Sequence, residues 1–270
     1  MDRADVRIAF VGAGAMGGAI ARGMLSAGGI AASQLAVAEV SAEIRASFSE
    51  LGIPVYADAA EMIASFDPDA VILAVKPQVA AVVVAPIAAL LGGRLIVSIM
   101  AGVPLSKLYG LCASERIIRL MPNLPVAARL GAIALAQGAA ATAEDVALTV
   151  DLLEALAVVK PMREDQLDAA GVVSGSSPAF FALFVDCLTR AGIEAGLPAA
   201  DCREMVEATM RGTAQQLLDS GEHPRSYLER VSSPGGTTIA ALRAMEGGVF
   251  YAIAAAVDAA LERTRALSEK

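Results

Sequence analysis

The chain has 270 residues, a formal net charge of −8 and a composition that is 56% hydrophobic and 4% aromatic, with no tryptophan. This length is sufficient to bury a sizeable core and favours two domains. The acidic balance, without a basic cluster interleaved with aromatic residues, argues against nucleic acid as a partner.

Neither a membrane span nor a secretion signal is expected. The most apolar region, residues 71–101, is interrupted by Lys76, Pro77 and Arg94, so it does not supply the roughly 20 consecutive apolar residues that a span needs. Charged residues and a strand open the chain, which leaves no room for a signal peptide. The three cysteines and the single histidine, His223, lack metal-ligand spacing. We therefore expect no metal site, and reduced thiols in a cytoplasmic protein.

A glycine-rich turn lies near the start of the chain. Residues 6–11 are an apolar run of strand length, and apolar residues at helical spacing follow the turn. In such a strand–turn–helix unit, one glycine makes the tight turn, one lets the backbone approach a pyrophosphate and one lets helix and strand pack closely. The pattern predicts dinucleotide binding, the alternative being a merely glycine-rich turn. The expected cofactor contacts are Gly12, Gly14, Ala15, Met16 and Gly17.

The second predicted strand, residues 35–40, carries the groups that distinguish the two nicotinamide cofactors. Glu39 lies about 20 residues past the glycines, the usual place for a carboxylate that binds ribose hydroxyls, and so favours NADH. Ser41 and Arg45 follow, and a hydroxyl and a guanidinium so placed are able to accept the 2′-phosphate of NADPH. Arg45 fits an ordinary solvated helix residue equally well. The cofactor is therefore predicted to be NADPH or NADH.

Further strand-like runs predict a doubly wound, mostly parallel sheet over residues 1–162. They occupy residues 70–75, 95–99, 117–121, 132–136 and 157–159. Ligands of such sheets bind at the carboxyl ends of strands. Two sets of residues fall there, and for their prolines strand termination is an equal alternative. We assign the first set to the cofactor and the second to the substrate: Ala74, Val75, Lys76 and Pro77, then Met121, Pro122 and Asn123.

From residue 163 onward the strand signals end and helical periodicity predicts an all-α second domain, residues 163–270. The expected helices span residues 165–173, 179–196, 199–219 and 239–267. A polar segment, residues 174–178, interrupts the first of them and ends in Pro178, which predicts either a kink or a ligand site. We expect this segment, through Ser176, to face the nicotinamide end of the cofactor, because the substrate has to lie between the two domains.

A loop of serines, glycines and threonines, residues 232–238, precedes the last predicted helix. Its glycines let backbone N–H groups approach a ligand, and the positive end of the helix dipole favours a carboxylate. An ordinary helix cap is the alternative. The expected substrate contacts are Ser233, Gly235, Gly236, Thr237 and Thr238.

The lysines separate this chain from one related class of enzyme. β-Hydroxyacid dehydrogenases also join a Rossmann domain to a helical domain, and they rely on a lysine of the helical domain as acid or base. Here no lysine occurs between Lys160 and Lys270, so that catalytic group is missing. His223 lies between glycine and proline and fits a turn residue better than a general acid.

Five segments in their order and spacing resemble pyrroline-5-carboxylate reductase, along the whole chain. They are residues 10–17 (FVGAGAMG), 74–77 (AVKP), 119–123 (RLMPN), 175–179 (GSSPA) and 232–238 (SSPGGTT). The chain departs from the family at Ala15, where asparagine is usual, and at Leu124, where threonine is common.

The resemblance implies reduction of L-1-pyrroline-5-carboxylate to L-proline by hydride transfer to the C=N carbon. It also implies an interlocked homodimer, in some members assembled into rings, in which the loop at 232–238 enters the partner's active site. In that site Thr238 would be the catalytic residue, hydrogen-bonded to the ring nitrogen. Two alternatives stay open: a reductase of another cyclic imino acid, or a non-catalytic NAD(P)-binding regulator.

Overall fold

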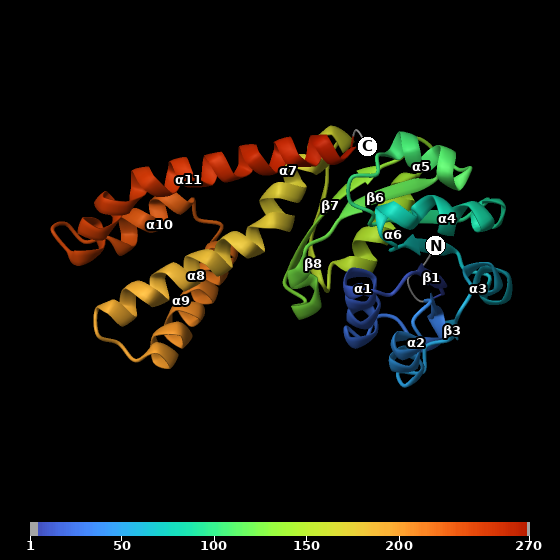
Figure 1. The fold of residues 1–270 in the computed structure, drawn as a ribbon, viewed down its shortest axis with the longest axis horizontal. Helices are drawn as coiled ribbons and strands as arrows, with labels where there is room; N and C mark the ends of the chain where they lie inside the picture. The colour runs from blue at the N-terminus through green and yellow to red at the C-terminus, as the bar shows by residue number, and fades with distance from the viewer. Residues whose placement is uncertain (1–4, 269–270) are drawn as a thin grey trace. The chain divides into compact units, whose positions relative to one another are not determined.

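The computed structural model describes residues 5–268, and the chain divides into two compact units (Figure 1). The first comprises the residues up to Ser176 together with those from Leu261 onward, and the second is Ser177–Ala260.

An eight-stranded sheet organises the first unit, in the order β3-β2-β1-β4-β5-β6-β7-β8. Every neighbouring pair is parallel except β6 and β7, which are antiparallel, so the prediction of a doubly wound, mostly parallel sheet is confirmed. The strands are β1 (Ile8–Val11), β2 (Leu35–Ala38), β3 (Val55–Tyr56), β4 (Ala70–Leu73), β5 (Leu95–Ser98), β6 (Ile117–Met121), β7 (Gly131–Gln137) and β8 (Ala157–Pro161). The two-residue strand β3 was not predicted, because so short a run carries no periodicity.

Helices cover both faces of this sheet, and each face has its own apolar core. The α-helices are α1 (Ala15–Ser26), α2 (Ala42–Ser49), α3 (Ala59–Phe66), α4 (Ala80–Val84), α5 (Leu105–Cys112) and α6 (Ala143–Leu153). Short 3₁₀ helices are η1 (Ala32–Gln34), η2 (Pro77–Val79), η3 (Ala85–Leu90) and η4 (Leu124–Ala128). Side chains of α1 and α6 fill one core, and side chains of α3, α4 and α5 fill the other.

Two strands end two residues earlier than the apolar runs predicted. The run at 35–40 leaves the sheet after Ala38, and the run at 70–75 leaves it after Leu73. Beyond these ends Glu39 and Ala74 each still donate one backbone hydrogen bond to the neighbouring strand, whereas Val40 is 88% exposed. Apolar composition alone therefore overstated the strands at the edge where ligands of such sheets bind.

The helical part begins with η5 (Glu164–Gln166) and α7 (Leu167–Ala170), which lead into a π-helical turn, η6 (Gly171–Ser176). It continues with α8 (Ser177–Glu194), α9 (Ala199–Ser220), α10 (Pro224–Val231) and α11 (Thr237–Ser268), so the all-α prediction is confirmed. The predicted interruption at 174–178 is wrong in form, because the helix widens there and does not break. Helix α10 was not predicted; His223 caps it, with Nδ1 accepting a hydrogen bond of 3.2 Å from the Arg225 N–H.

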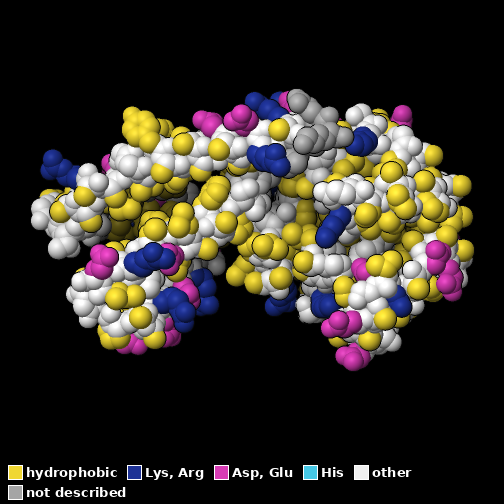
Figure 2. All heavy atoms as spheres, in the orientation of Figure 1, with side chains coloured by type: hydrophobic (Ala, Val, Ile, Leu, Met, Phe, Trp, Pro, Cys, Tyr) yellow, Lys and Arg dark blue, Asp and Glu magenta, His cyan; other side chains and the backbone are white. Residues whose placement is uncertain are grey.

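The second unit has little core of its own. Helices α8 and α9 lie side by side, and a Cβ on Gly192 would collide with the sulfur of Cys202, so glycine allows their close approach (Figure 1). Among the described residues Cys202 is the only buried one on α9, and α8 has none. Large apolar side chains are exposed along these helices, and Figure 2 shows many of them on the visible face.

Two helical stretches are long and apolar enough to cross a membrane by length and composition alone: Glu164–Glu194 and Thr237–Ala266. Their mean hydropathies are 1.5 and 1.4, and 6% and 0% of the tested windows are buried. Such a test is weak evidence for a membrane, since a helix covered by a second subunit has the same composition.

Candidate active site

The glycine turn between β1 and α1 has the geometry of a dinucleotide cradle. Gly12 has a φ of +91°, a conformation that favours glycine. A Cβ on Gly17 would lie 2.6 Å from Ala74 Cβ and 2.7 Å from the Gly12 carbonyl oxygen, so only glycine lets α1 pack this closely. A Cβ on Gly14 would meet nothing within 4 Å. The space beside Gly14 is therefore open to a ligand, while the other two glycines are fixed by the fold.

The amino end of α1 completes this cradle. Its N-cap is Gly14, which is extended and, within the described part of the chain, provides no side-chain cap for the helix. The first amide groups of a helix are orphan donors and its dipole favours negative charge, so phosphate is a natural ligand here. The residues present thus fit the pyrophosphate of a dinucleotide.

Glu39 lies at the carboxyl end of β2 and connects that strand to the cradle. Its Oε2 accepts a hydrogen bond of 2.9 Å from the Ala13 N–H, and its Oε1 accepts one of 3.0 Å from the Ser41 N–H. Ser41 caps α2 through its Oγ, and Arg45 donates to the carbonyls of Glu39 and Val40 at 2.6 and 2.9 Å. Both candidate phosphate ligands therefore have local structural partners in this structure.

The carboxyl ends of β1, β4, β5 and β6 share one edge of the sheet, because these strands are parallel. After β4, Ala74 and Val75 are half-buried, and the Ala74 N–H donates to the Val11 carbonyl at 2.9 Å. Lys76 is exposed, and Pro77 opens the 3₁₀ helix η2. The structure therefore places all four predicted cofactor residues at the edge that carries the glycine turn.

The end of β6 meets the π-helical turn η6. Asn123 is 8% exposed; its Oδ1 accepts from the Ala132 N–H at 2.9 Å and its Nδ2 donates to the Ser174 carbonyl at 3.0 Å. A Cβ on Gly171 would lie 3.3 Å from Met121 Cε. Pro122, between Met121 and Asn123, is buried, and Ser176 is half-buried in the same turn. These predicted substrate residues are brought together in the first unit.

Arg119, on β6, has a role that the sequence analysis missed. Its side chain is 4% exposed and pairs with Glu164 at 3.0 Å and Asp168 at 3.5 Å. The Nε atom has no hydrogen-bond partner among the described residues. Glu164 Oε1 also accepts a hydrogen bond of 2.6 Å from the N–H of Leu105, the first residue of α5. The available signal was a charged residue within an apolar strand, which usually has a buried partner.

The loop at 232–238 belongs to the second unit. Gly235 has a φ of +72°, which favours glycine, and a Cβ on Gly236 would lie 2.5 Å from Ser233 Oγ, so a side chain there would displace that hydroxyl. The Gly236 N–H donates to the Ser233 carbonyl at 3.0 Å. Thr237 and Thr238 are exposed and are the first two residues of α11, where backbone N–H groups have no intrahelical acceptor. This arrangement suits a small anion such as a carboxylate. Within residues 5–268 no group of three or more metal-binding side chains occurs.

Two family models match the chain. One, described as pyrroline-5-carboxylate reductase dimerisation, covers residues 164–267, and the other, described as NADP oxidoreductase coenzyme F420-dependent, covers residues 7–102. A pyrroline-5-carboxylate reductase from Pseudomonas aeruginosa is 37% identical over 98% of this chain and 97% of its own length. One from Arabidopsis thaliana is 35% identical over 97% of this chain and 96% of its own.

The chain belongs to the pyrroline-5-carboxylate reductase family. Solved structures agree with this assignment. The reductase from Coxiella burnetii has a TM-score of 0.92 and 28% identity, and covers 98% of this chain and 99% of its own. The Plasmodium falciparum pyrroline carboxylate reductase, solved with NADP bound, has a TM-score of 0.86 and 27% identity, with 98% of both chains covered. The resemblance drawn from five short segments is therefore confirmed, and the family's two-part architecture matches the two predicted domain types.

Proposed function

We propose that this protein reduces L-1-pyrroline-5-carboxylate to L-proline with NADH or NADPH. Its membership of the reductase family is the observation that carries the proposal. Two local features support it. The open space beside Gly14 suits a pyrophosphate, and the exposed amino end of α11 suits the substrate carboxylate.

The proposed reaction requires little acid catalysis from the protein's side chains. A cyclic imine is protonated near neutral pH, so it is already an activated electrophile. When bound, the reduced nicotinamide supplies the hydride. The chain's own work is positioning: backbone N–H groups at Gly235, Gly236 and Thr237, with Ser233, hold the carboxylate, and the Thr238 hydroxyl hydrogen-bonds the ring nitrogen.

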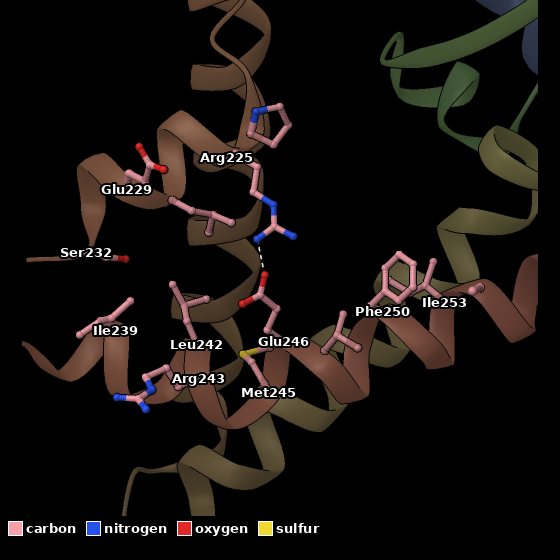
Figure 3. Close-up of a pocket in the computed structure, with 14 residues that line it drawn as sticks. Arg225, Glu229, Ser232, Ile239, Leu242, Arg243, Met245, Glu246, Phe250 and Ile253 are labelled. Atoms are coloured by element: carbon pink, nitrogen blue, oxygen red, sulfur yellow. Dashed lines mark hydrogen bonds and ion pairs between the residues drawn. The ribbon is translucent and has the colours of Figure 1, made fainter.

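We further propose a homodimer in which residues 163–270 form the interface and residues 232–238 complete the partner's active site. A groove of about 690 Å³ between α10 and α11 supports this, since its lining is largely apolar (Figure 3). Leu242, Met245 and Phe250 lie along it, and Arg225 of α10 pairs with Glu246 of α11 beside them. A second copy of the chain is the occupant that the dimerisation match favours. A ring of dimers, a cytoplasmic location and the absence of membrane and nucleic-acid partners complete the proposal.

Steady-state oxidation of NADH and NADPH with a panel of cyclic imines tests the function. The panel contains pyrroline-5-carboxylate, the six-membered piperideine carboxylate and a thiazoline carboxylate. We expect the pyrroline to have the highest kcat/KM. A higher value for either other ring would assign the enzyme to a different imino acid. No oxidation with any imine, by protein that binds the dinucleotide, would support a regulator instead.

A further inference from the structure

Asn123 connects three separate parts of the first unit through its side-chain amide. The residue itself follows β6, its Oδ1 accepts from Ala132 in β7, and its Nδ2 donates to the carbonyl of Ser174 in η6. The partners fix which atom is oxygen and which is nitrogen, because an N–H requires an acceptor and a carbonyl requires a donor. With 8% exposure, the amide is largely committed to the protein.

The proline at position 178 explains why the turn at Ser174 is wide. In an α-helix the carbonyl of residue 174 would accept from the N–H of residue 178, but proline has none, and its ring collides with the carbonyl four residues earlier. A π-helical turn moves that carbonyl away from the ring. Asn123 then supplies a side-chain donor to the same carbonyl.

The turn lies at the ligand edge of the sheet. Its first residue, Gly171, packs against Met121, the last residue of β6, and Asn123 lies two residues beyond. Strands β6, β5, β4 and β1 are consecutive and parallel, so the turn is about 14 Å along the edge from the glycine turn, at three strand spacings. This is the crevice in which such sheets bind their ligands.

We propose that Asn123 is a positioning residue that holds the turn Gly171–Ser176 and thereby sets the Ser176 hydroxyl at this edge, without itself touching the imine. This inference rests on the proposed function for its kinetic consequence. Its structural part, the coupling between Asn123 and Pro178 through the Ser174 carbonyl, does not depend on any activity.

The kinetic test uses Asn123→Asp, which retains the acceptor for Ala132 but replaces the donor to Ser174 with an oxygen. Every group proposed to touch the imine stays, so the KM for the imine and the Kd for the dinucleotide should change little. Because the turn loses one well-made hydrogen bond, we expect kcat to fall about tenfold. If Asn123 instead contacts the substrate directly, the KM should change and kcat should not. A carboxylate placed against the substrate carboxylate would raise KM strongly at unchanged kcat, and that result, or no change in either constant, would overturn the proposal.

The structural test is a double-mutant cycle with Pro178→Ala, which gives residue 178 an N–H for the Ser174 carbonyl. Thermal unfolding is measured for the wild type, both single variants and the pair. We expect the loss of Tm from Asn123→Asp to be smaller in the Pro178→Ala background, and Asn123→Ser provides the same cycle if Asn123→Asp does not fold. Additive changes would mean that Asn123 and Pro178 act independently, and would overturn the proposed coupling even in a fully active enzyme. An inactive wild type with a coupled cycle would instead refute the proposed function alone.

Discussion

Glu39 and Ala13 are joined by a hydrogen bond of 2.9 Å from the Ala13 N–H to Glu39 Oε2, which ties the end of β2 to the glycine turn. The carboxylate is thus held where a dinucleotide of this fold places its adenosine ribose. A fixed negative charge at that position accepts hydrogen bonds from ribose hydroxyls and repels a 2′-phosphate.

NADH should therefore support turnover at least as well as NADPH. Glu39→Gln removes the repulsion and should raise the NADPH/NADH ratio of kcat/KM, whereas Glu43→Gln, an exposed carboxylate on α2, should leave the ratio unchanged. A wild-type ratio above about ten, equivalent to about 1.4 kcal/mol, would contradict the prediction and favour Ser41 and Arg45 as phosphate ligands.

Thr238→Ala should affect the chemical step more than cofactor binding. The variant removes a hydroxyl and keeps the backbone N–H groups of the loop, so kcat/KM should fall by about 10- to 100-fold, the scale of one hydrogen bond to a partly charged group of roughly 1.5 to 3 kcal/mol. Imine-dependent NAD(P)H oxidation and a cofactor titration are measured on the same protein, with Thr213→Ala of α9 as control. Unchanged turnover would reduce Thr238 to a helix cap.

Co-expression of two impaired variants should restore activity if the loop at 232–238 acts on the partner. A Cβ at Gly14 meets no atom within 4 Å, so Gly14→Val extends into the open space proposed for the pyrophosphate, and Thr238→Ala impairs the loop. Random pairing gives one complete site in half of the dimers, so about a quarter of wild-type activity is expected. If each subunit uses its own loop, the mixture is no more active than the average of the two variants alone.

Leu183→Glu should dissociate the proposed dimer. Leu183 lies on α8 and is 62% exposed, so a carboxylate there costs the single chain little but is unfavourable in an apolar interface. Sedimentation should show a monomer that binds dinucleotide and lacks reductase activity. Val82→Glu, at a 77% exposed position on α4, should remain dimeric and active. A dimeric Leu183→Glu would exclude this face of α8 from the interface.

Asp145→Asn should reduce stability in a pH-dependent manner. The Arg116 guanidinium binds Asp145 through two bonds of 3.0 and 2.8 Å and holds the pKa of its carboxyl below the usual range, against the opposing effect of burial. A depressed folded pKa contributes stability above the unfolded pKa of about 3.9, and this is lost as pH falls through the lower folded value.

The free energy of unfolding should therefore fall by about 1.5 to 3 kcal/mol at pH 7 in Asp145→Asn, and the difference from wild type should shrink below about pH 4. Asp67→Asn is the matched control, because the Arg94–Asp67 pair is also 2.8 Å long but Asp67 is 73% exposed. It should shift the unfolding midpoint far less. Equal effects of the two substitutions would contradict the importance of burial.

Much of the fold followed from periodicity. Seven of the eight strands overlap the predicted apolar runs, and the glycine turn is identified by spacing alone. Helix α10 could not be predicted, because its eight residues, opened by Pro224, carry a charged, short pattern that resembles a turn. The π-helical turn was also beyond sequence reasoning, since Pro178 predicts a disturbance but not that the helix continues through it.

The residues of the candidate site could be predicted from the sequence, but their long-range hydrogen-bond and ion-pair partners could not. Gly12, Gly14 and Gly17 have the spacing that a motif encodes. The bonds of Asn123 to Ala132 and Ser174 join residues 9 and 51 positions away, and no spacing rule reports such long-range contacts. Arg119 belongs to segment 119–123, which carries part of the family resemblance. Its pairing with Glu164 depends on the register of β6 against the sheet.

The shared carboxylate of Glu164 has a consequence for dividing this protein into pieces. Residues 163–168 contain no strand, yet Glu164 and Asp168 neutralise the buried Arg119, and Glu164 also binds the first amide of α5. A fragment ending at Met162 would leave a guanidinium inside the sheet unit without either carboxylate, a strongly destabilising arrangement. A fragment ending at Ser176 keeps both. In chimeras that exchange helical units between relatives, the crossover point therefore has to lie beyond Asp168, or the incoming segment has to bring both acidic residues with it.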